Sequence, residues 1–334
     1  MVHLRIVVPS YQSEHALELL EKVPTVCNVI FLERAAQRPV GDVILCDVAR
    51  EDASIIVSDL KELDIDREGS IAMEDIDSQI SQAAASAEKA AFGLPSDAVV
   101  WEEVEARTSE NVELSASFLA FMALATMIAA CGIYLDQPIL IIGAMVVGPE
   151  FGPLAALCVA AVQKRRDLAK RSLLALAVGF PLAIAASFLL TLAIDTAGLI
   201  PEDFASENHP FTDFISNPDV FSFLVAFFAG VAGVLSLTSA KSGALIGVLI
   251  SVTTIPSAAN IGVAAALGDG EEWLGAMAQL SLNLGAILLA GIATLYVQRR
   301  IYIRRRRKHL SDKSAREAAG LPIGHSRRAD SITR

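Results

Sequence analysis

The stretch ILIIGAMVVGPEFGPLAALCVAAV, residues 139–162, decides how this chain is interpreted. It is apolar and long enough to cross a bilayer, for which about 20 residues suffice. Its middle nevertheless holds Gly148, Pro149, Glu150, Gly152 and Pro153. Prolines remove hydrogen bonds from a helix, and a carboxylate is costly inside a membrane. Because interrupted membrane helices line protein-enclosed or wet cavities, the stretch predicts a functional site rather than a simple anchor.

The overall composition indicates a membrane protein with several spans. Of the 334 residues, 53% are hydrophobic and 19% are charged, with a mean hydropathy of +0.50. Such a chain is too apolar for a soluble protein. Residues 1–114 carry 23 acidic against 9 basic residues, so an acidic soluble domain should precede the membrane domain. Nucleic-acid binding is not expected, because phosphate contacts need a basic face.

Residues 1–76 predict an α+β ferredoxin-like cytoplasmic domain. Their apolar patterns indicate strands at 3–8, 26–33, 42–49 and 70–75, with helices at 13–22 and 52–63. The order β-α-β-β-α-β is the ferredoxin-like pattern. Because that fold hosts many functions, both a structural or oligomerising cap and a small-molecule sensor remain open.

The rest of the chain predicts a helical linker, a membrane domain and a tail. The linker, 77–114, should form one helix over 77–91 and a second that begins at Ser96 or Asp97. The membrane domain, 115–298, should hold six transmembrane helices, at 115–135, 139–162, 172–194, 220–240, 243–267 and 275–297. The tail, 299–334, is basic and then polar, which predicts disorder in the cytoplasm.

The distribution of Lys and Arg predicts the orientation in the membrane. These residues occur between the second and third segments, at Lys241 and from Arg299 to Lys308, whereas the connections 136–138, 195–219 and 268–274 contain none. By the positive-inside rule both termini should be cytoplasmic. The cluster Arg304–Lys308 fits anionic lipid headgroups, although a plain stop-transfer role explains it equally well.

The second and fifth segments resemble each other, which predicts an internal repeat. Gly143 aligns with Gly247, and the run 159–161 with the run 263–265, at a constant offset of 104 residues. Because the matches are small residues, chance similarity competes with a true repeat. Three segments per half would make the two halves inverted, as in many secondary transporters with interrupted helices.

The two interruptions supply the candidate substrate- or ion-binding residues: Gly148, Pro149, Glu150, Gly152, Pro153, Thr253, Thr254, Pro256, Ser257, Asn260 and Asn283. Glu150 is the only acid well inside a segment, so it could couple a proton or cation or contact a substrate. A protonated or water-exposed glutamate near one mouth is the alternative. The hydroxyls around Pro256 could instead satisfy freed backbone groups, and Asn283 could simply join two helices.

No enzymatic or metal-binding pattern is present in the sequence. The four cysteines are scattered without zinc-site spacing, and no histidine lies in an apolar segment. Phosphate-binding loops, HExxH and GxSxG patterns are also missing. We therefore expect no enzyme, and the sequence assigns no cofactor.

Three runs carry a resemblance to a known family: SDAVVWEEVEA at 96–106, IIGAMVVGPEFGP at 141–153, and TTIPSAANIGVAAALGDGEEWLGAMAQLSLNL at 253–284. Over about residues 70–300 the chain resembles prokaryotic membrane proteins of domain of unknown function 389, the uncharacterised hydrophobic domain family. The resemblance implies a multi-pass protein of the prokaryotic inner (plasma) membrane with a cytoplasmic N-terminal domain, and no established substrate. Glu150 departs from the family pattern, in which a hydrophobic or small residue is common there.

These observations favour a transporter or permease for a small solute or ion, with its site at the midplane where the two interruptions meet. An ion channel shares every one of these features. A membrane-anchored sensor or scaffold that uses the ferredoxin-like domain is a further alternative. A homo-oligomer is expected, because such sheets often pair through their edges.

Overall fold

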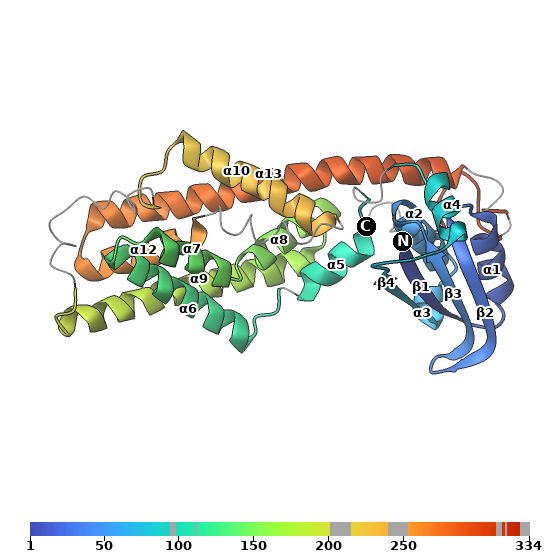
Figure 1. Cartoon of the computed structure of the whole chain (residues 1–334), viewed down its shortest axis with the longest axis horizontal. Helices are drawn as coiled ribbons and strands as arrows, with labels where there is room; N and C mark the ends of the chain where they lie inside the picture. The colour runs from blue at the N-terminus through green and yellow to red at the C-terminus, as the bar shows by residue number, and fades with distance from the viewer. Residues whose placement is uncertain are drawn as a thin grey trace. The chain divides into compact units, whose positions relative to one another are not determined.

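The structure is a computed structural model that describes residues 1–93, 98–110, 112–200, 215–239, 253–311, 316–317 and 319–327. Clustering of the contacts divides the chain into two compact units. We call the first the N-terminal unit; it comprises Met1–Val104, Thr238–Ala240 and Val297–Arg334. We call the second the helical unit; it comprises Glu105–Leu237 and Lys241–Tyr296. Figure 1 labels the helices and strands of both.

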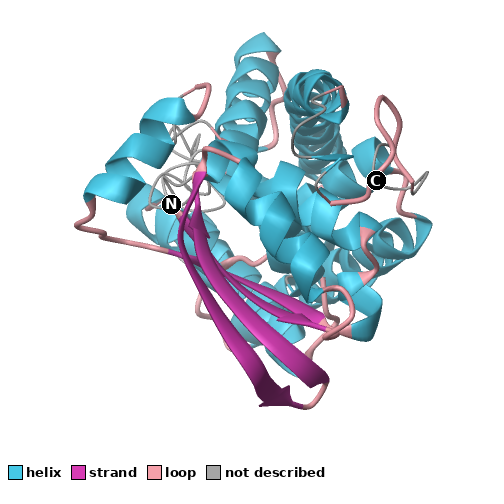
Figure 2. Cartoon of the chain, turned by 90° about the vertical axis from the view of Figure 1, so that its right-hand side faces the viewer, coloured by secondary structure: helices cyan, strands magenta, loops and turns pink. Residues whose placement is uncertain are grey.

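The N-terminal unit contains a four-stranded antiparallel sheet, whose strands lie side by side in Figure 2. The strands are β1 (Val2–Val8), β2 (Val26–Gln37), β3 (Val40–Val48) and β4 (Ser70–Asp75), in the order β2-β3-β1-β4. With helices α1 (Ser13–Lys22) and α2 (Arg50–Glu62), they give the element order β-α-β-β-α-β that the sequence predicts. A short helix, α3 (Ile65–Glu68), precedes β4.

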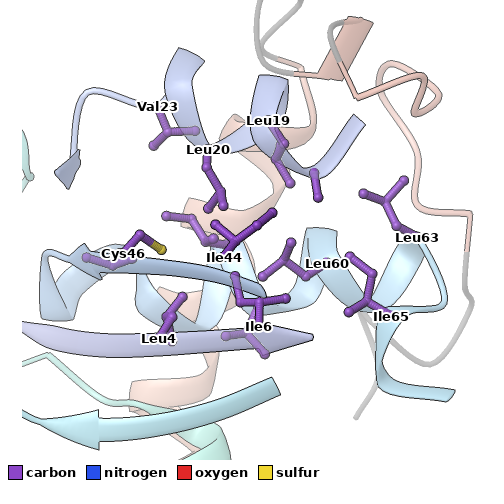
Figure 3. Packing of buried hydrophobic residues seen from close by; sticks show 14 of the residues in the cluster. Leu4, Ile6, Leu19, Leu20, Val23, Ile44, Cys46, Leu60, Leu63 and Ile65 are labelled. Atoms are coloured by element: carbon purple, nitrogen blue, oxygen red, sulfur yellow. The ribbon is translucent and has the colours of Figure 1, made fainter. Parts of the chain in front are cut away.

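The core of this unit forms where α1 and α2 meet one face of the sheet. Alternate residues of β1 are buried, because successive side chains of a strand point to opposite faces. In Figure 3, Leu4 and Ile6 of β1 point toward Leu19 and Leu20 of α1 and toward Leu60 of α2. Burying each such side chain contributes about 1.5–3 kcal/mol, so this cluster is a main source of the unit's stability.

The linker differs in part from its prediction. Helix α4 (Gln82–Ala90) begins later than the expected residue 77, because Ser81 accepts a hydrogen bond from the Ala84 amide and caps the helix there. Helix α5 covers Trp101–Glu110. Ser96 and Asp97, where the second linker helix was expected to begin, lie outside the described residues.

The helical unit is built from apolar helices. Their bounds are α6 (Ala116–Tyr134), α7 (Pro138–Val147), α8 (Phe151–Gln163), α9 (Arg166–Thr196), α10 (Val220–Thr238), α12 (Thr254–Leu267) and α13 (Gly270–Leu310). Among the described residues, α6, α9, α10 and α13 are long and apolar enough to cross a membrane, and α7 with α8 would make a fifth, bent span. Residues 243–252 of the predicted fifth segment lie outside the described part, and α12 alone has only 14 residues.

The helix bounds repeat along the chain at one spacing. Helices α6 and α10 each have 19 residues, and α10 begins and ends 104 positions after α6. Helix α12 ends 104 positions after α8, and α13 begins 104 positions after α9. This is the offset at which the second and fifth segments align in sequence.

Small residues allow the helices of this unit to approach closely. A Cβ on Gly262 of α12 would lie 2.0 Å from the Ser187 Oγ and 2.5 Å from the Ile184 carbonyl oxygen, both on α9. Only glycine fits there, since atoms never approach so closely without displacement. The contact brings α12 against α9, as close small-residue packing does in membrane helix bundles.

Some described residues of the C-terminal part take defined positions that its composition does not predict. Helix α13 continues to Leu310, and Arg306 and Arg316 are buried within the N-terminal unit. Arg306 pairs with Glu62 of α2 at 2.8 Å, and Arg316 pairs with Asp59 at 2.7 Å and with Glu62 at 2.9 Å. We call this set of residues the ion cluster. The expectation of a disordered tail is therefore wrong for Arg316, because carboxylates distant in sequence fix it in place.

Candidate functional site

The interruption predicted within residues 139–162 is present between α7 and α8. The two helices are bent by 52° at a break that runs from Gly148 to Glu150. Pro153 is the third residue of α8, where a missing backbone donor costs little because first-turn amides have no partner within the helix. The prolines therefore set where α8 begins instead of kinking a continuous helix.

Gly148 is fixed by a close approach at this break. A Cβ there would lie 2.6 Å from Cγ1 of Ile255, in the first turn of α12, and 2.4 Å from Oε2 of Glu150. Any larger residue would have to displace one of these groups. The break and the start of α12 are thus packed directly against each other through the bare glycine backbone.

Glu150 is buried at the break, with an exposed fraction of 5%. Its Oε1 accepts a hydrogen bond of 2.6 Å from the Thr254 hydroxyl. Its Oε2 has no hydrogen-bond partner among the described residues. A buried carboxylate with an unpaired oxygen is unusual, since buried polar groups are nearly always satisfied. The geometry leaves one oxygen able to receive a proton or a cation.

The second predicted interruption coincides with the start of α12. Thr253 precedes the helix, Thr254 is its first residue and Pro256 its third. The Thr253 Oγ1 accepts hydrogen bonds from Asn283 Nδ2 at 2.8 Å and from Gln279 Nε2 at 3.4 Å, both on α13. Thr254 thus contacts Glu150 at the break, while Asn283 contacts the neighbouring Thr253. Nothing in the sequence pattern distinguished Gln279, whose buried Oε1 has no partner among the described residues.

Ser257 and Asn260 take other roles. The Ser257 hydroxyl donates to the Thr253 carbonyl at 2.7 Å and to the Ile215 carbonyl at 3.3 Å, so it satisfies backbone groups around Pro256. Asn260 donates to Glu272 Oε1 at 2.7 Å. It lies six positions beyond Thr254, or about 9 Å along a helix. The structure thus does not bring these two side chains to the Glu150 carboxylate.

A cavity of about 370 Å³ opens on the same break. Gly148, Pro149 and Gly152 line it on one side, and Glu110 and Glu113 belong to its lining as well. Glu150 itself does not line the cavity, but its Oε2 lies next to Gly148, where an added Cβ would approach it to 2.4 Å. Sequence reasoning missed Glu110 and Glu113, although two acids immediately before the first apolar segment were an available signal.

Comparison with known proteins finds a similarity to one family and indicates no activity. A family model described as "Domain of unknown function (DUF389)" matches residues 145–289, which contain both interruptions. An uncharacterized protein of Methanocaldococcus jannaschii is 28% identical over 194 residues, covering 58% of this chain and 58% of that protein. The chain therefore matches less than two thirds of that relative's length. No solved structure matches the chain.

Proposed function

We propose that this chain, which belongs over residues 145–289 to the family of domain of unknown function 389, is a membrane transporter for a small solute or ion, with its site at the two interruptions. The observation that carries the proposal is the buried Glu150 carboxylate, bonded to Thr254 on one oxygen and unpaired on the other. An anchor has no need of such a group, because an intramembrane carboxylate is costly and is kept for a function.

The proposal includes an inverted repeat of three spans in each half. The recurrence of helix bounds at 104 residues supports it, and so does one contact. Thr254 lies 104 positions after Glu150, so under this offset the two residues are equivalent. Equivalent residues touch only where a twofold axis passes between them. An axis through this contact would put the site at the midplane, where inverted-repeat transporters bind their substrates.

Under this proposal the bent pair α7–α8 forms one span, and α12 completes the fifth span together with the residues before it. Six spans place both termini on one side of the membrane. The positive-inside rule makes that side cytoplasmic, because basic residues are confined to the connections on it.

We propose further that the coupling ion or substrate is a cation, with the proton included. Glu110 and Glu113 line the cavity at the break, and Gly148, which also lines it, lies next to the buried Glu150. Converging carboxylates attract cations, and the field is strong where low-dielectric walls surround the cavity. Thr254 occupies one oxygen of Glu150 as a donor, which leaves the second oxygen for the ion.

The test is flux into liposomes that contain the purified protein, measured for protons and a panel of cations with and without a pH gradient. Glu150→Gln keeps an acceptor for the Thr254 hydroxyl and removes the charge. We expect coupled flux to fall below about a tenth of wild type, equivalent to about 1.4 kcal/mol. Glu271→Gln is the matched control, because Glu271 is an exposed acid of the same unit.

Wild-type flux equal to that of empty vesicles across the panel would count against transport. Unchanged flux and pH dependence in Glu150→Gln would remove the carboxylate from the mechanism. Ohmic single-channel currents in planar bilayers would favour a channel over a carrier, since a carrier saturates and moves ions slowly.

A further inference from the structure

The N-terminal unit holds a cavity of about 530 Å³ that the proposed transport does not use. Its walls come from the end of α1, the residues before β2, the first turns of α2 and the end of α13. Four basic side chains line it: Lys22, Arg305, Lys308 and His309. Asp52 is the one carboxylate among the described lining residues. This concentration of positive charge at one cavity identifies a place where an anion is favoured.

Several polar groups in this cavity have no partner among the described residues. Thr25 is 2% exposed, and its hydroxyl makes no hydrogen bond in the part of the chain that the structure describes. Buried hydroxyls are almost always paired, so this one points to a missing acceptor. Lys22 and Lys308 form no salt bridge with any described residue. Three donors thus lie at this cavity without a partner among the described residues: Lys22 at the end of α1, Thr25 just before β2, and Lys308 in α13.

The other two basic side chains are held in position. The Arg305 guanidinium donates to the Phe92 carbonyl and lies 5.9 Å from the centre of the Phe92 ring. His309 Nε2 lies 2.6 Å from Asp59 Oδ2. Between them, Arg306 is buried in the ion cluster, which fixes the end of α13. Two of the four basic side chains are therefore preorganised, which lowers the cost of ordering this part of the wall when a ligand binds.

The cavity also has an apolar wall. Phe92 is 84% exposed although it lines the cavity, and Pro24 lies in the lining too. An exposed aromatic ring next to a cluster of cations suits a ligand that carries both an anionic group and an apolar or aromatic part. The volume falls within the range of about 300–1,000 Å³ that small-molecule sites occupy.

We propose that this cavity binds a phosphate ester, with the phosphate on Lys22, Lys308 and the Thr25 hydroxyl and the organic part against Phe92. Phosphate supplies several strong acceptor oxygens, which match the three unpartnered donors. A soluble nucleotide and a phospholipid headgroup share this chemistry, and the experiment below distinguishes them. The proposal does not depend on transport, because none of these residues lies at the helix break.

The test uses the full-length protein in neutral detergent and isothermal titration calorimetry. The probes are inorganic pyrophosphate, AMP, and short-chain phosphatidylglycerol compared with phosphatidylcholine. The pocket variant is Lys22→Gln with Lys308→Gln. The control variant is Arg5→Gln with Arg38→Gln, which removes the same charge from exposed positions outside the cavity.

We expect at least one phosphate probe to bind the wild type, with a Kd raised about tenfold or more in the pocket variant and less than about twofold in the control. Thr25→Val should weaken the same probe about threefold without lowering the melting temperature, because it removes a hydroxyl that has no partner among the described residues. Binding of AMP or pyrophosphate would assign a soluble ligand. Binding of phosphatidylglycerol alone would assign a lipid headgroup.

Two results would overturn the proposal. One is the absence of binding for every probe. The other is an equal loss of affinity in the pocket and control variants, since general electrostatic attraction, and not this cavity, would then explain the binding.

Discussion

Replacing Asp59 by Asn should strongly destabilise the N-terminal unit. Asp59 is fully buried, and its Oδ1 lies 2.5 Å from Arg306 and 2.7 Å from Arg316. The amide would leave two buried guanidinium groups with less negative charge around them. Removing one partner of a buried ion pair costs about 3–5 kcal/mol. We expect the lower end, about 3 kcal/mol, because Glu62 keeps a bond to each arginine.

The assay is urea unfolding of the full-length protein in detergent, followed by tryptophan fluorescence. The chain has two tryptophans, and Trp273→Phe leaves Trp101, 7% exposed in the N-terminal unit, as the sole reporter. With a slope of about 1–3 kcal/mol per molar urea, a loss of about 3 kcal/mol lowers the midpoint by about 1–3 M. Asp77→Asn, at an exposed carboxylate, is the control and should leave the midpoint in place.

A midpoint for Asp59→Asn within about 0.3 M of the parent would refute the reasoning, because the ion cluster would then contribute less than a surface pair. The same result would also remove the argument that the cluster fixes the end of α13.

Three further predictions follow from the structure. Burial raises the pKa of Asp59, but the hydrogen bond from His309 and the charges of Arg306 and Arg316 outweigh burial and leave that pKa below its ordinary value. The ionised Asp59 should therefore stabilise the fold fully above about pH 5, and this stabilisation should decline as the pH falls further. Urea unfolding at a series of pH values measures the decline. Asp59→Asn should flatten that decline, and a decline of unchanged steepness would contradict the assignment. Gly148→Ala should destabilise the helical unit by about 1–3 kcal/mol, because the alanine Cβ would overlap Ile255. The expected readout is a lower melting temperature in detergent, and an unchanged melting temperature would contradict the packing. Glu110→Gln with Glu113→Gln should raise the cation concentration for half-maximal flux and weaken its dependence on ionic strength, whereas Glu271→Gln should change neither.

Local patterns predicted the elements whose formation depends on neighbours in sequence. Residues 13–22 form α1 and residues 70–75 form β4 with the expected bounds. The apolar periodicity of a short helix or strand determines its buried face, so such elements can be predicted from the sequence alone. The break at Gly148 could be predicted for a related local reason. Two prolines within six residues prevent α7 from continuing as one regular helix into α8.

Contacts between distant residues could not be predicted in this way. The arginine-rich end of α13 has the composition of a membrane edge, and only the folded chain brings Arg306 to a carboxylate 244 positions away. Asn260 shows the same limit within the candidate site. Its position near Pro256 suggested a role at the break, but a helical turn sets the direction of a side chain, and its amide bonds to Glu272.

The pairing of Glu150 with Thr254 has a physical reason under the proposed inverted repeat. Equivalent residues beside a twofold axis lie within hydrogen-bond distance, so an acid in both halves would place two carboxylates together. Like charges that close cannot both ionise, and they would share a single proton. With Thr254 at the equivalent position, Glu150 is the single carboxylate of the pair that can take up or release a proton. Its hydroxyl donates to the ionised acid and accepts from the protonated one, so the contact persists in both states. Under the proposed transport, this departure from symmetry would allow one proton or cation to be taken up and released without breaking the contact between the two proposed halves.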